Sequence, residues 1–239
     1  MKVIFIKKTI FKAIVLMLIF FTTFSLNCTI LDVSSAYINR KLPIYSVQTT
    51  ENKLAISFDA AWGADKTQEI MDICEDYGIK ATFFLVGNYL EKCPEIVKQI
   101  VEDGHTVGNH TYHHKDMELL TSEEEFLNEL IDLENLYKQI VLSEMPKFYR
   151  PPQGKYTEQQ LEWAKKAGYK TCFWSLAYVD WDEKKQPSKE EAMNKLTERI
   201  HPGAIVLLHS TSSTNAEIMD EIIKKWKEMG YEFGELKDL

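Results

Sequence analysis

The chain has 239 residues, of which 45% are hydrophobic and 27% are charged, as in an ordinary globular protein. This length is enough for one sizeable domain and a leader segment. The net charge is −8, and the first 36 residues contribute +3 through four lysines and one aspartate, which leaves −11 for the remainder. Such an acidic body argues against nucleic acid as a partner and favours a neutral or weakly charged substrate.

The first residues are typical of a targeting segment. Lysines occur within the first twelve residues, and the stretch 13–31 contains no charged residue. Residues 1–36 are therefore predicted to be a signal peptide, cleaved near Ala36, or an uncleaved membrane anchor. Because the basic flank precedes the apolar run, either alternative places the following domain outside the cytoplasm, with membrane contact only through residues 1–36. Residues 37–52 are predicted to be a polar linker, and residues 53–239 the functional domain.

Helices and strands alternate along this domain. Four predicted helices end at a glycine that is followed by a β-rich run, and these glycines are Gly78, Gly104, Gly168 and Gly230. A glycine after the last turn readily adopts the left-handed conformation that closes a helix. Three predicted helix starts have the spacing of a capping box, namely Thr121 with Glu124, Thr157 with Gln160, and Ser188 with Glu191. The alternation predicts an α/β domain with a parallel sheet covered by helices, and periodicity alone leaves open a barrel or an open sheet.

The strongest functional motif is a pair of histidines, His110 and His114. They are four residues apart, so a helical turn would place both imidazoles on one face, where they can bind a single divalent metal. The carboxyl ends of parallel strands converge on one mouth of the fold, so polar residues that follow such strands are expected to share a site. Such residues follow four predicted strands. Asp59 comes after 54–58, Arg150 after 148–149 and His209 after 204–208, and the run that ends at Trp181 comes after 173–174.

Together these motifs resemble those of the polysaccharide deacetylases of the NodB type, carbohydrate esterase family 4. The family order is an Asp at a strand end, a His-Ser/Thr-x-x-His motif, an Arg-x-Pro motif, an Asp/Trp motif and a closing Leu-x-His strand. The resemblance covers roughly residues 53–239, and it implies a distorted (β/α) barrel of about seven parallel strands. The runs 150–154, 173–181 and 201–205 also resemble the delta-lactam-biosynthetic de-N-acetylases of the spore cortex.

The resemblance implies catalytic roles for three residues and a metal site. Asp59 would be the general base that takes a proton from water, Arg150 would orient that base, and His209 would be the general acid for the leaving amine. His110 and His114 would bind a divalent metal, with Zn²⁺ as the first choice and Co²⁺ or another ion as alternatives.

Four further residues are assigned by the resemblance to substrate binding. The backbone N–H of Gln153 would face the oxyanion, Leu207 would line the acetyl pocket, and Trp181 would stack on a sugar face. Asp180, the surviving aspartate of the fourth motif, is placed with them. Trp174, in contrast, is interpreted as a core residue of a strand.

The chain departs from the wider family at two positions. Ala60 stands where a second Asp usually ligates the metal, and Ala177 stands where the fourth motif usually has an Asp. Two imidazoles and water would then hold the metal more weakly, or Asp65 would substitute for the missing carboxylate. The delta-lactam subgroup resembles this chain in both respects, so we interpret the departures as subtype markers.

The function implied is a metal-dependent amidohydrolase that removes N-acetyl groups from the glycan strand of peptidoglycan. N-acetylmuramic acid, on the route to muramic delta-lactam in spore cortex, is the expected substrate. The alternatives are an N-acetylglucosamine deacetylase of peptidoglycan or chitin-like oligomers, and a metal-poor sugar-binding module.

The cysteines form no C-x-x-C pair, which argues against a structural zinc site. Cys74, Cys93 and Cys172 are interpreted as free thiols, and a Cys74–Cys93 disulfide remains open for an exported domain.

Overall fold

The computed structural model describes residues 43–61 and 63–238. The predicted leader, residues 1–36, and the first part of the predicted linker lie outside these residues. Within the described part of the chain, no helix is both long and apolar enough to span a membrane.

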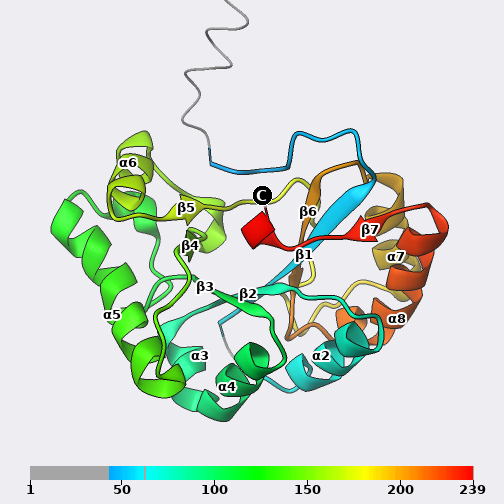
Figure 1. The fold of residues 1–239 in the computed structure, drawn as a ribbon, viewed down its shortest axis with the longest axis horizontal. Helices are drawn as coiled ribbons and strands as arrows, with labels where there is room; N and C mark the ends of the chain where they lie inside the picture. The colour runs from blue at the N-terminus through cyan, green and yellow to red at the C-terminus, as the bar shows by residue number, and fades with distance from the viewer. Residues whose placement is uncertain (1–42, 62, 239) are drawn as a thin grey trace, which may run out of the picture. The chain divides into compact units, whose positions relative to one another are not determined.

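The centre of the domain is a parallel sheet that curls into a distorted barrel (Figure 1). Within the described residues the sheet has seven strands in the order β5-β4-β3-β2-β1-β6, and β7 pairs with the start of β1. This confirms the fold predicted from the resemblance. The strands are β1 (Lys53–Ala60), β2 (Thr82–Leu85), β3 (Thr106–Asn109), β4 (Phe148–Tyr149), β5 (Lys170–Thr171), β6 (Ala204–His209) and β7 (Glu232–Phe233).

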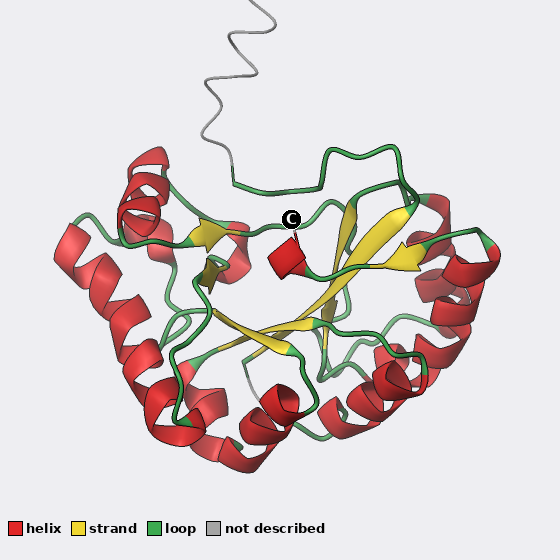
Figure 2. Ribbon diagram, in the orientation of Figure 1, coloured by secondary structure: helices red, strands yellow, loops and turns green. Residues whose placement is uncertain are grey.

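Helices pack around the outside of the curled sheet (Figure 2). They are α2 (Thr67–Asp76), α3 (Gly87–Lys92), α4 (Pro94–Glu102), α5 (Glu123–Val141), α6 (Glu158–Lys166), α7 (Lys189–Glu198) and α8 (Ser213–Glu228). Short 3₁₀ turns occur at η1 (Met117–Leu119), η2 (Pro152–Gly154) and η3 (Leu236–Asp238). All four glycines predicted to follow helices have positive φ, between 65° and 89°.

Two of the three predicted capping boxes are confirmed. Thr157 caps α6 and Ser188 caps α7, each with the reciprocal side-chain contact of a capping box. The third prediction is wrong by one residue, because Ser122 rather than Thr121 caps α5 and accepts from the N–H of Glu125. Both residues have a hydroxyl and both are followed three positions later by Glu, so the spacing alone did not separate them.

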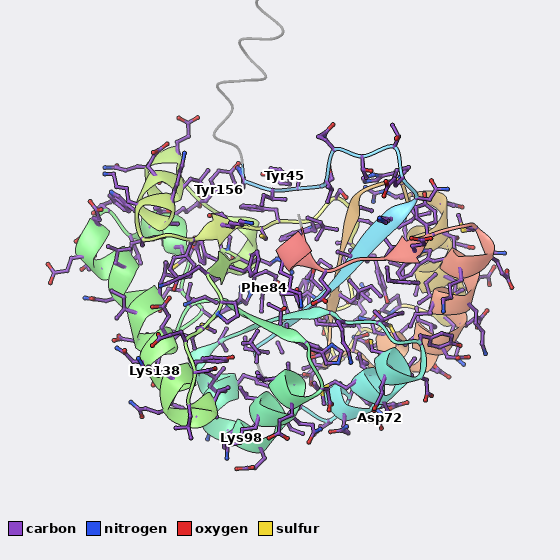
Figure 3. The ribbon with its side chains drawn as sticks, viewed as in Figure 1. Tyr45, Asp72, Phe84, Lys98, Lys138 and Tyr156 are labelled. Atoms are coloured by element: carbon purple, nitrogen blue, oxygen red, sulfur yellow. The ribbon has the colours of Figure 1, made fainter. Side chains whose placement is uncertain are left out.

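Side chains of the strands alternate between the outer core and the interior of the barrel. On β1, Ile56 and Phe58 pack outward against the helices, whereas Ser57 and Asp59 face inward. Phe84 of β2 lies in the interior, at the centre of the view in Figure 3, where the labelled Asp72, Lys98 and Lys138 lie on the outer helices. Because of this alternation, the polar side chains of β1 and β6 lie in the same interior space.

The predicted strand at Phe173–Trp174 is wrong. β5 ends at Thr171, and the chain beyond it makes only single bridges, from Cys172 to Ile44 and from Leu176 to Val206. The β-rich composition of this run matched a strand, but its neighbours across the barrel seam are irregular segments, so no continuous ladder forms.

Residues 43–47 close the gap between β5 and β6. The N–H of Ile44 donates to Thr171 O at 2.9 Å, and the N–H of Val47 donates to Gly203 O at 2.8 Å. The Tyr45 ring lies tilted beside the Phe173 ring, with centroids 4.8 Å apart. The Tyr45 hydroxyl lies 3.1 Å from that of Tyr156, and both residues are labelled in Figure 3. The described part of the predicted linker, residues 43–52, is therefore part of the domain, because its backbone groups complete the barrel.

The three described cysteines carry free thiols, as preferred from the sequence. Cys74 and Cys172 are buried and Cys93 is half-buried, and burial raises the pKa of the Cys74 thiol to about 12. Within the described residues a Cys74–Cys93 bond is not formed, so the disulfide alternative is wrong for this structure.

Candidate active site

A cavity of about 630 Å³ lies at the carboxyl ends of the strands. The register of the sheet places Asp59 of β1 directly beside His209 of β6. Leu207 also faces this space, because it is two residues before His209 on the same strand. The cavity is lined by Asp59, Ala61, His110, His114, Gln153, Trp174, Ala177, Tyr178, Trp181, Glu183, Leu207, His209 and Thr211.

Arg150 and Asp59 form a buried ion pair. The guanidinium of Arg150 is fully buried and donates from Nη1 to Asp59 Oδ1 at 2.6 Å. Nη2 donates to Ser57 Oγ at 2.8 Å, and the remaining donors reach the carbonyls of Cys172 and Phe173. Burial alone would raise the pKa of Asp59, but Arg150 and the nearby histidines together hold that pKa below its ordinary value. Asp59 is therefore a fixed, ionised carboxylate at neutral pH.

His110 follows β3 and is held by the backbone of Arg150. Its Nδ1 lies 2.8 Å from Arg150 O, and since a carbonyl only accepts, Nδ1 carries the proton. Nε2 then presents its lone pair toward Asp59 Oδ2, 3.5 Å away. Burial lowers the pKa of His110 to about 4, so the ring is neutral near pH 7. This tautomer and charge are those of a metal-binding imidazole.

His114 lies beside His110, but no helix brings them together. The ring centroids are 5.0 Å apart, and the residues between them form a loop in which Thr111 and His114 have φ values of 69° and 53°. The prediction of a helical turn is therefore wrong. Left-handed backbone costs roughly 1–2 kcal/mol for an ordinary residue. Here the N–H of Thr111 donates to Asn109 Oδ1, and the N–H of His114 donates to Thr111 Oγ1.

The histidine pair fits a divalent metal with open coordination positions. The pKa of His114 is lowered, chiefly by burial, so it too is neutral near pH 7, and both rings line the same cavity as the Asp59 carboxylate. Ala60 supplies no ligand, because its side chain is buried in the outer core. Asp65 is not among the residues that line this cavity; it lines a smaller neighbouring pocket that shares Glu183 and Thr211 with the cavity. Across the described residues, no group of three or more His, Cys, Asp or Glu side chains is arranged as a complete metal site, so the fit rests on the two histidines, with the other coordination positions open.

His209 is paired with Asp180 on one side and lines the cavity on the other. His209 Nδ1 donates to Asp180 Oδ1 at 2.7 Å, and its backbone N–H donates to Asp180 Oδ2 at 2.8 Å. Asn215 of α8 also donates to Asp180 Oδ2, at 2.6 Å. Burial opposes the charged ring, but the contact with Asp180 raises the pKa of His209 above its ordinary value. His209 can therefore hold a proton on Nε2 for a leaving group.

This position corrects the assignment of Asp180 to substrate binding. Asp180 is 1% exposed and its carboxylate is occupied by His209 and Asn215. It lies behind the acid, not on the cavity wall, so we assign it to orienting His209. The motif indicated an important Asp, but the sequence contained no signal for the direction of its side chain.

The cavity walls include the other residues predicted to bind substrate. They also include Trp174 and Tyr178, which were not predicted to lie there. Trp181 is 61% exposed at the rim, and Gln153 lines the cavity with a left-handed backbone, φ 58°. Trp174, predicted to be a core residue, also lines the cavity, because the chain leaves the sheet before it. Tyr178 was not predicted; its hydroxyl donates to Asn215, which connects the wall to the Asp180 pair.

Ser57 is a second residue that was missed. Its hydroxyl donates to Val206 O at 2.8 Å and accepts from Arg150. Strand alternation would have found it, because Ser57 precedes Asp59 by two residues and must face the same interior.

The remaining histidines lie away from the cavity wall. His105 is buried and its Nδ1 accepts from the N–H of Ala81, while His201 contacts Ser175 and the backbone of Pro202. His113 points away from the cavity to Glu129, which agrees with its interpretation as a residue other than a ligand.

Comparison with known proteins decides the family. The model of the family described as polysaccharide deacetylase matches residues 46–172, which is more than half of the chain. This chain belongs to the polysaccharide deacetylase family. It is therefore a hydrolase of the kind that acts on N-acetyl amide bonds, and members of this family generally use a divalent metal.

Two curated relatives act on different sugars by name. The chain is 33% identical over 195 residues to the peptidoglycan-N-acetylmuramic acid deacetylase PdaA of Bacillus subtilis, covering 82% of this chain and 74% of that protein. It is 35% identical over 185 residues to a peptidoglycan-N-acetylglucosamine deacetylase of Bacillus cereus, covering 76% and 66%.

Solved structures share the fold closely. The structure of Bacillus subtilis PdaA, a family 4 carbohydrate esterase, superposes with a TM-score of 0.81 at 32% identity, covering 86% of this chain and 87% of that one. A family 4 pseudoenzyme from Bacillus anthracis superposes with a TM-score of 0.77 at 29% identity, covering 83% and 69%. The family fold therefore also occurs in proteins described as pseudoenzymes, so the roles of individual residues in the reaction are argued from the geometry of the site and not from the fold.

Proposed function

We propose that this protein removes the N-acetyl group from N-acetylmuramic acid in peptidoglycan. The observation that carries the proposal is the register pair of Asp59 and His209, whose pKa values are shifted in opposite directions within one cavity. Two titratable groups separated in this way supply a base and an acid at the same pH. The similarity to PdaA supports muramic acid as the sugar.

The residues divide the work of amide hydrolysis. Asp59, oriented by Arg150, takes a proton from the attacking water, and His209 gives a proton to the nitrogen as the bond from nitrogen to the acetyl carbon breaks. A divalent metal held by His110 and His114 would polarise the carbonyl and acidify the water when bound. The products are acetate and a free amine on the sugar.

The walls of the cavity suit an acetylated sugar. Leu207 is apolar, 5% exposed and adjacent to the catalytic pair, where the acetyl methyl group would lie. Trp181 presents an exposed ring at the rim, suited to stacking on a sugar face. The backbone N–H of Gln153 would donate to the oxyanion as it develops.

The freed amine of muramic acid lies near the lactyl carboxyl of the same sugar. Formation of an amide between them, with loss of water, would give the muramic delta-lactam of spore cortex. We therefore propose a role in sporulation, in a compartment outside the cytoplasm reached through residues 1–36. Fractionation checks the location: intact chain found soluble in the cytoplasm would contradict it.

Deacetylation of N-acetylglucosamine is the second candidate. It is favoured by the 35% identity to the Bacillus cereus enzyme. Acetate release from peptidoglycan glycans with and without stem peptides, with mass spectrometry of the products, separates the two sugars. Deacetylated glucosamine as the only product would overturn the muramic acid proposal.

Two variants test whether the protein is an enzyme or a metal-poor sugar-binding module. His110→Ala and His114→Ala are each expected to abolish acetate release and bound metal together, because the two imidazoles supply the ligands identified in the cavity. The control is the parent protein treated with a chelator and then given Zn²⁺. Unchanged acetate release by both variants would exclude the metal-dependent mechanism.

A further inference from the structure

One buried carboxylate outside the cavity, that of Glu129, binds the histidine loop, residues 110–115, through hydrogen bonds and an ion pair. Glu129 lies on α5, far from the loop in sequence, and is 4% exposed. Its Oε2 accepts from the backbone N–H of His113 at 2.9 Å, and its Oε1 accepts from His113 Nδ1 at 2.9 Å and from Lys115 Nζ at 2.6 Å. Its backbone carbonyl accepts from the N–H of Tyr112 at 3.0 Å.

These contacts flank His114 on both sides. Residues 113 and 115 bind the carboxylate, while His114 between them faces the cavity. His114 and Thr111 have left-handed backbone, which ordinary residues keep only when their surroundings impose it. Within the loop, the N–H of His114 donates to the Thr111 hydroxyl at 3.1 Å, and Glu129 holds the residues on either side of it, His113 and Lys115.

We propose that Glu129 is a positioning residue that sets the spacing of His110 and His114, and so the metal affinity of the site. Glu129 is not among the residues that line the cavity, so it acts on the site through the loop. His110 is fixed separately, through its Nδ1 on the carbonyl of Arg150. Glu129 therefore determines where the second imidazole stands relative to the first. The inference rests on the metal-binding part of the proposed function.

The test measures Zn²⁺ affinity by competition with a chromophoric chelator, without substrate. Glu129→Gln keeps the shape of the side chain but loses the charge that holds Lys115 and His113, and we expect the affinity to fall about 10- to 100-fold, as for other residues that orient ligands. A thermal unfolding curve of the metal-free variant confirms that it is folded at the assay temperature.

A charge control separates positioning from electrostatic attraction. Asp116 lies just beyond the loop, and its carboxylate pairs with Lys155 instead of the loop. Asp116→Asn removes the same charge near the site, and we expect its Zn²⁺ affinity to stay within about twofold of the parent. If Asp116→Asn lost as much Zn²⁺ affinity as Glu129→Gln, the effect of Glu129 would be one of charge alone, and the positioning role would be overturned.

For Lys115→Met, positioning and electrostatic attraction predict changes of opposite sign in the Zn²⁺ affinity. The lysine side chain is 51% exposed, so the variant is expected to fold. Removing a positive charge would raise the affinity for Zn²⁺ if only electrostatics mattered. If Glu129 acts by positioning the loop, the Zn²⁺ affinity should instead fall by about threefold or more, because the contact between Lys115 and Glu129 is lost. If Glu129→Gln does not fold, this variant decides the question.

The outcomes distinguish this inference from the proposed function. Parent-like Zn²⁺ affinity in both folded Glu129→Gln and Lys115→Met would overturn the role of Glu129 alone. Parent-like affinity in His110→Ala would overturn the metal site itself. Acetate release by the parent, together with a lower Zn²⁺ affinity in Glu129→Gln, would support both the proposed function and the positioning role of Glu129.

Discussion

Removing Arg150 is expected to destabilise the domain more than any surface change. Its guanidinium is fully buried and neutralises Asp59, whose side chain is only 8% exposed. Arg150→Met would leave this carboxylate, the Ser57 hydroxyl and two carbonyls without their donor. Breaking a buried ion pair by removing one partner costs about 3–5 kcal/mol. Domains of this size are stable by about 5–15 kcal/mol, so a large part of the stability would be lost.

The pH dependence of this loss has a definite sign. In the parent, the lowered pKa of Asp59 contributes stability above the ordinary value of 3.8, and this contribution is lost as the pH falls through the folded-state pKa. In Arg150→Met, burial is the dominant remaining effect and raises the pKa of Asp59. Acidification then lets the carboxyl take a proton, so the difference in unfolding free energy between parent and variant narrows.

Urea unfolding followed by circular dichroism measures both effects, in chelator, at pH 7 and pH 5. The double variant Arg150→Met/Asp59→Asn removes both charges and provides the matched control. We expect it to be more stable than Arg150→Met alone, because no unpaired carboxylate remains buried. An unfolding free energy of Arg150→Met within about 1 kcal/mol of the parent at pH 7 would refute the reasoning, as would a double variant that is less stable still.

Three further predictions concern the catalytic pair and the barrel seam. Asp59→Asn should lower the rate of acetate release about 10²-fold or more while the metal stays bound, since general-base catalysis contributes about 10²–10⁴-fold; parent-like rates would remove Asp59 from that role. Asp180→Asn should lower the pKa of His209, because burial then acts without its carboxylate partner, so the alkaline limb of the pH–rate profile should move to lower pH; an unmoved limb at full metal occupancy would contradict the pairing. Gly203→Ala should lower the melting temperature by several degrees, because a Cβ there would lie 2.0 Å from Val47 O at φ 75°; an unchanged melting temperature would show that the seam does not depend on this contact.

The sequence determined the fold class and most of the residues that meet in the cavity. Glycines after helices, capping boxes and the order of the five motifs depend on local chemistry and spacing, which are visible in the chain itself. Asp59 and His209 could be expected together because parallel strands end at one mouth, and the register of β1 and β6 places them side by side.

Tertiary structure alone decided how the polar residues are held. The histidines meet through a left-handed loop rather than a helical turn, and Glu129 of α5 supports that loop across a distance that no local pattern records. Asp180 lies behind His209 because the chain after β5 leaves the sheet and crosses toward α8. Side-chain direction in irregular segments depends on long-range packing partners, and spacing in the sequence does not encode those partners.

Residues 43–52 show the same division. Their polar composition is typical of a linker, and the sequence contains no strand pattern there. The barrel nevertheless leaves unpaired backbone groups between β5 and β6, and Ile44 and Val47 satisfy them through hydrogen bonds to Thr171 and Gly203. A buried backbone group requires a partner whatever the side chain, so this contact depends on the closure of the fold and not on the identity of the residues that make it.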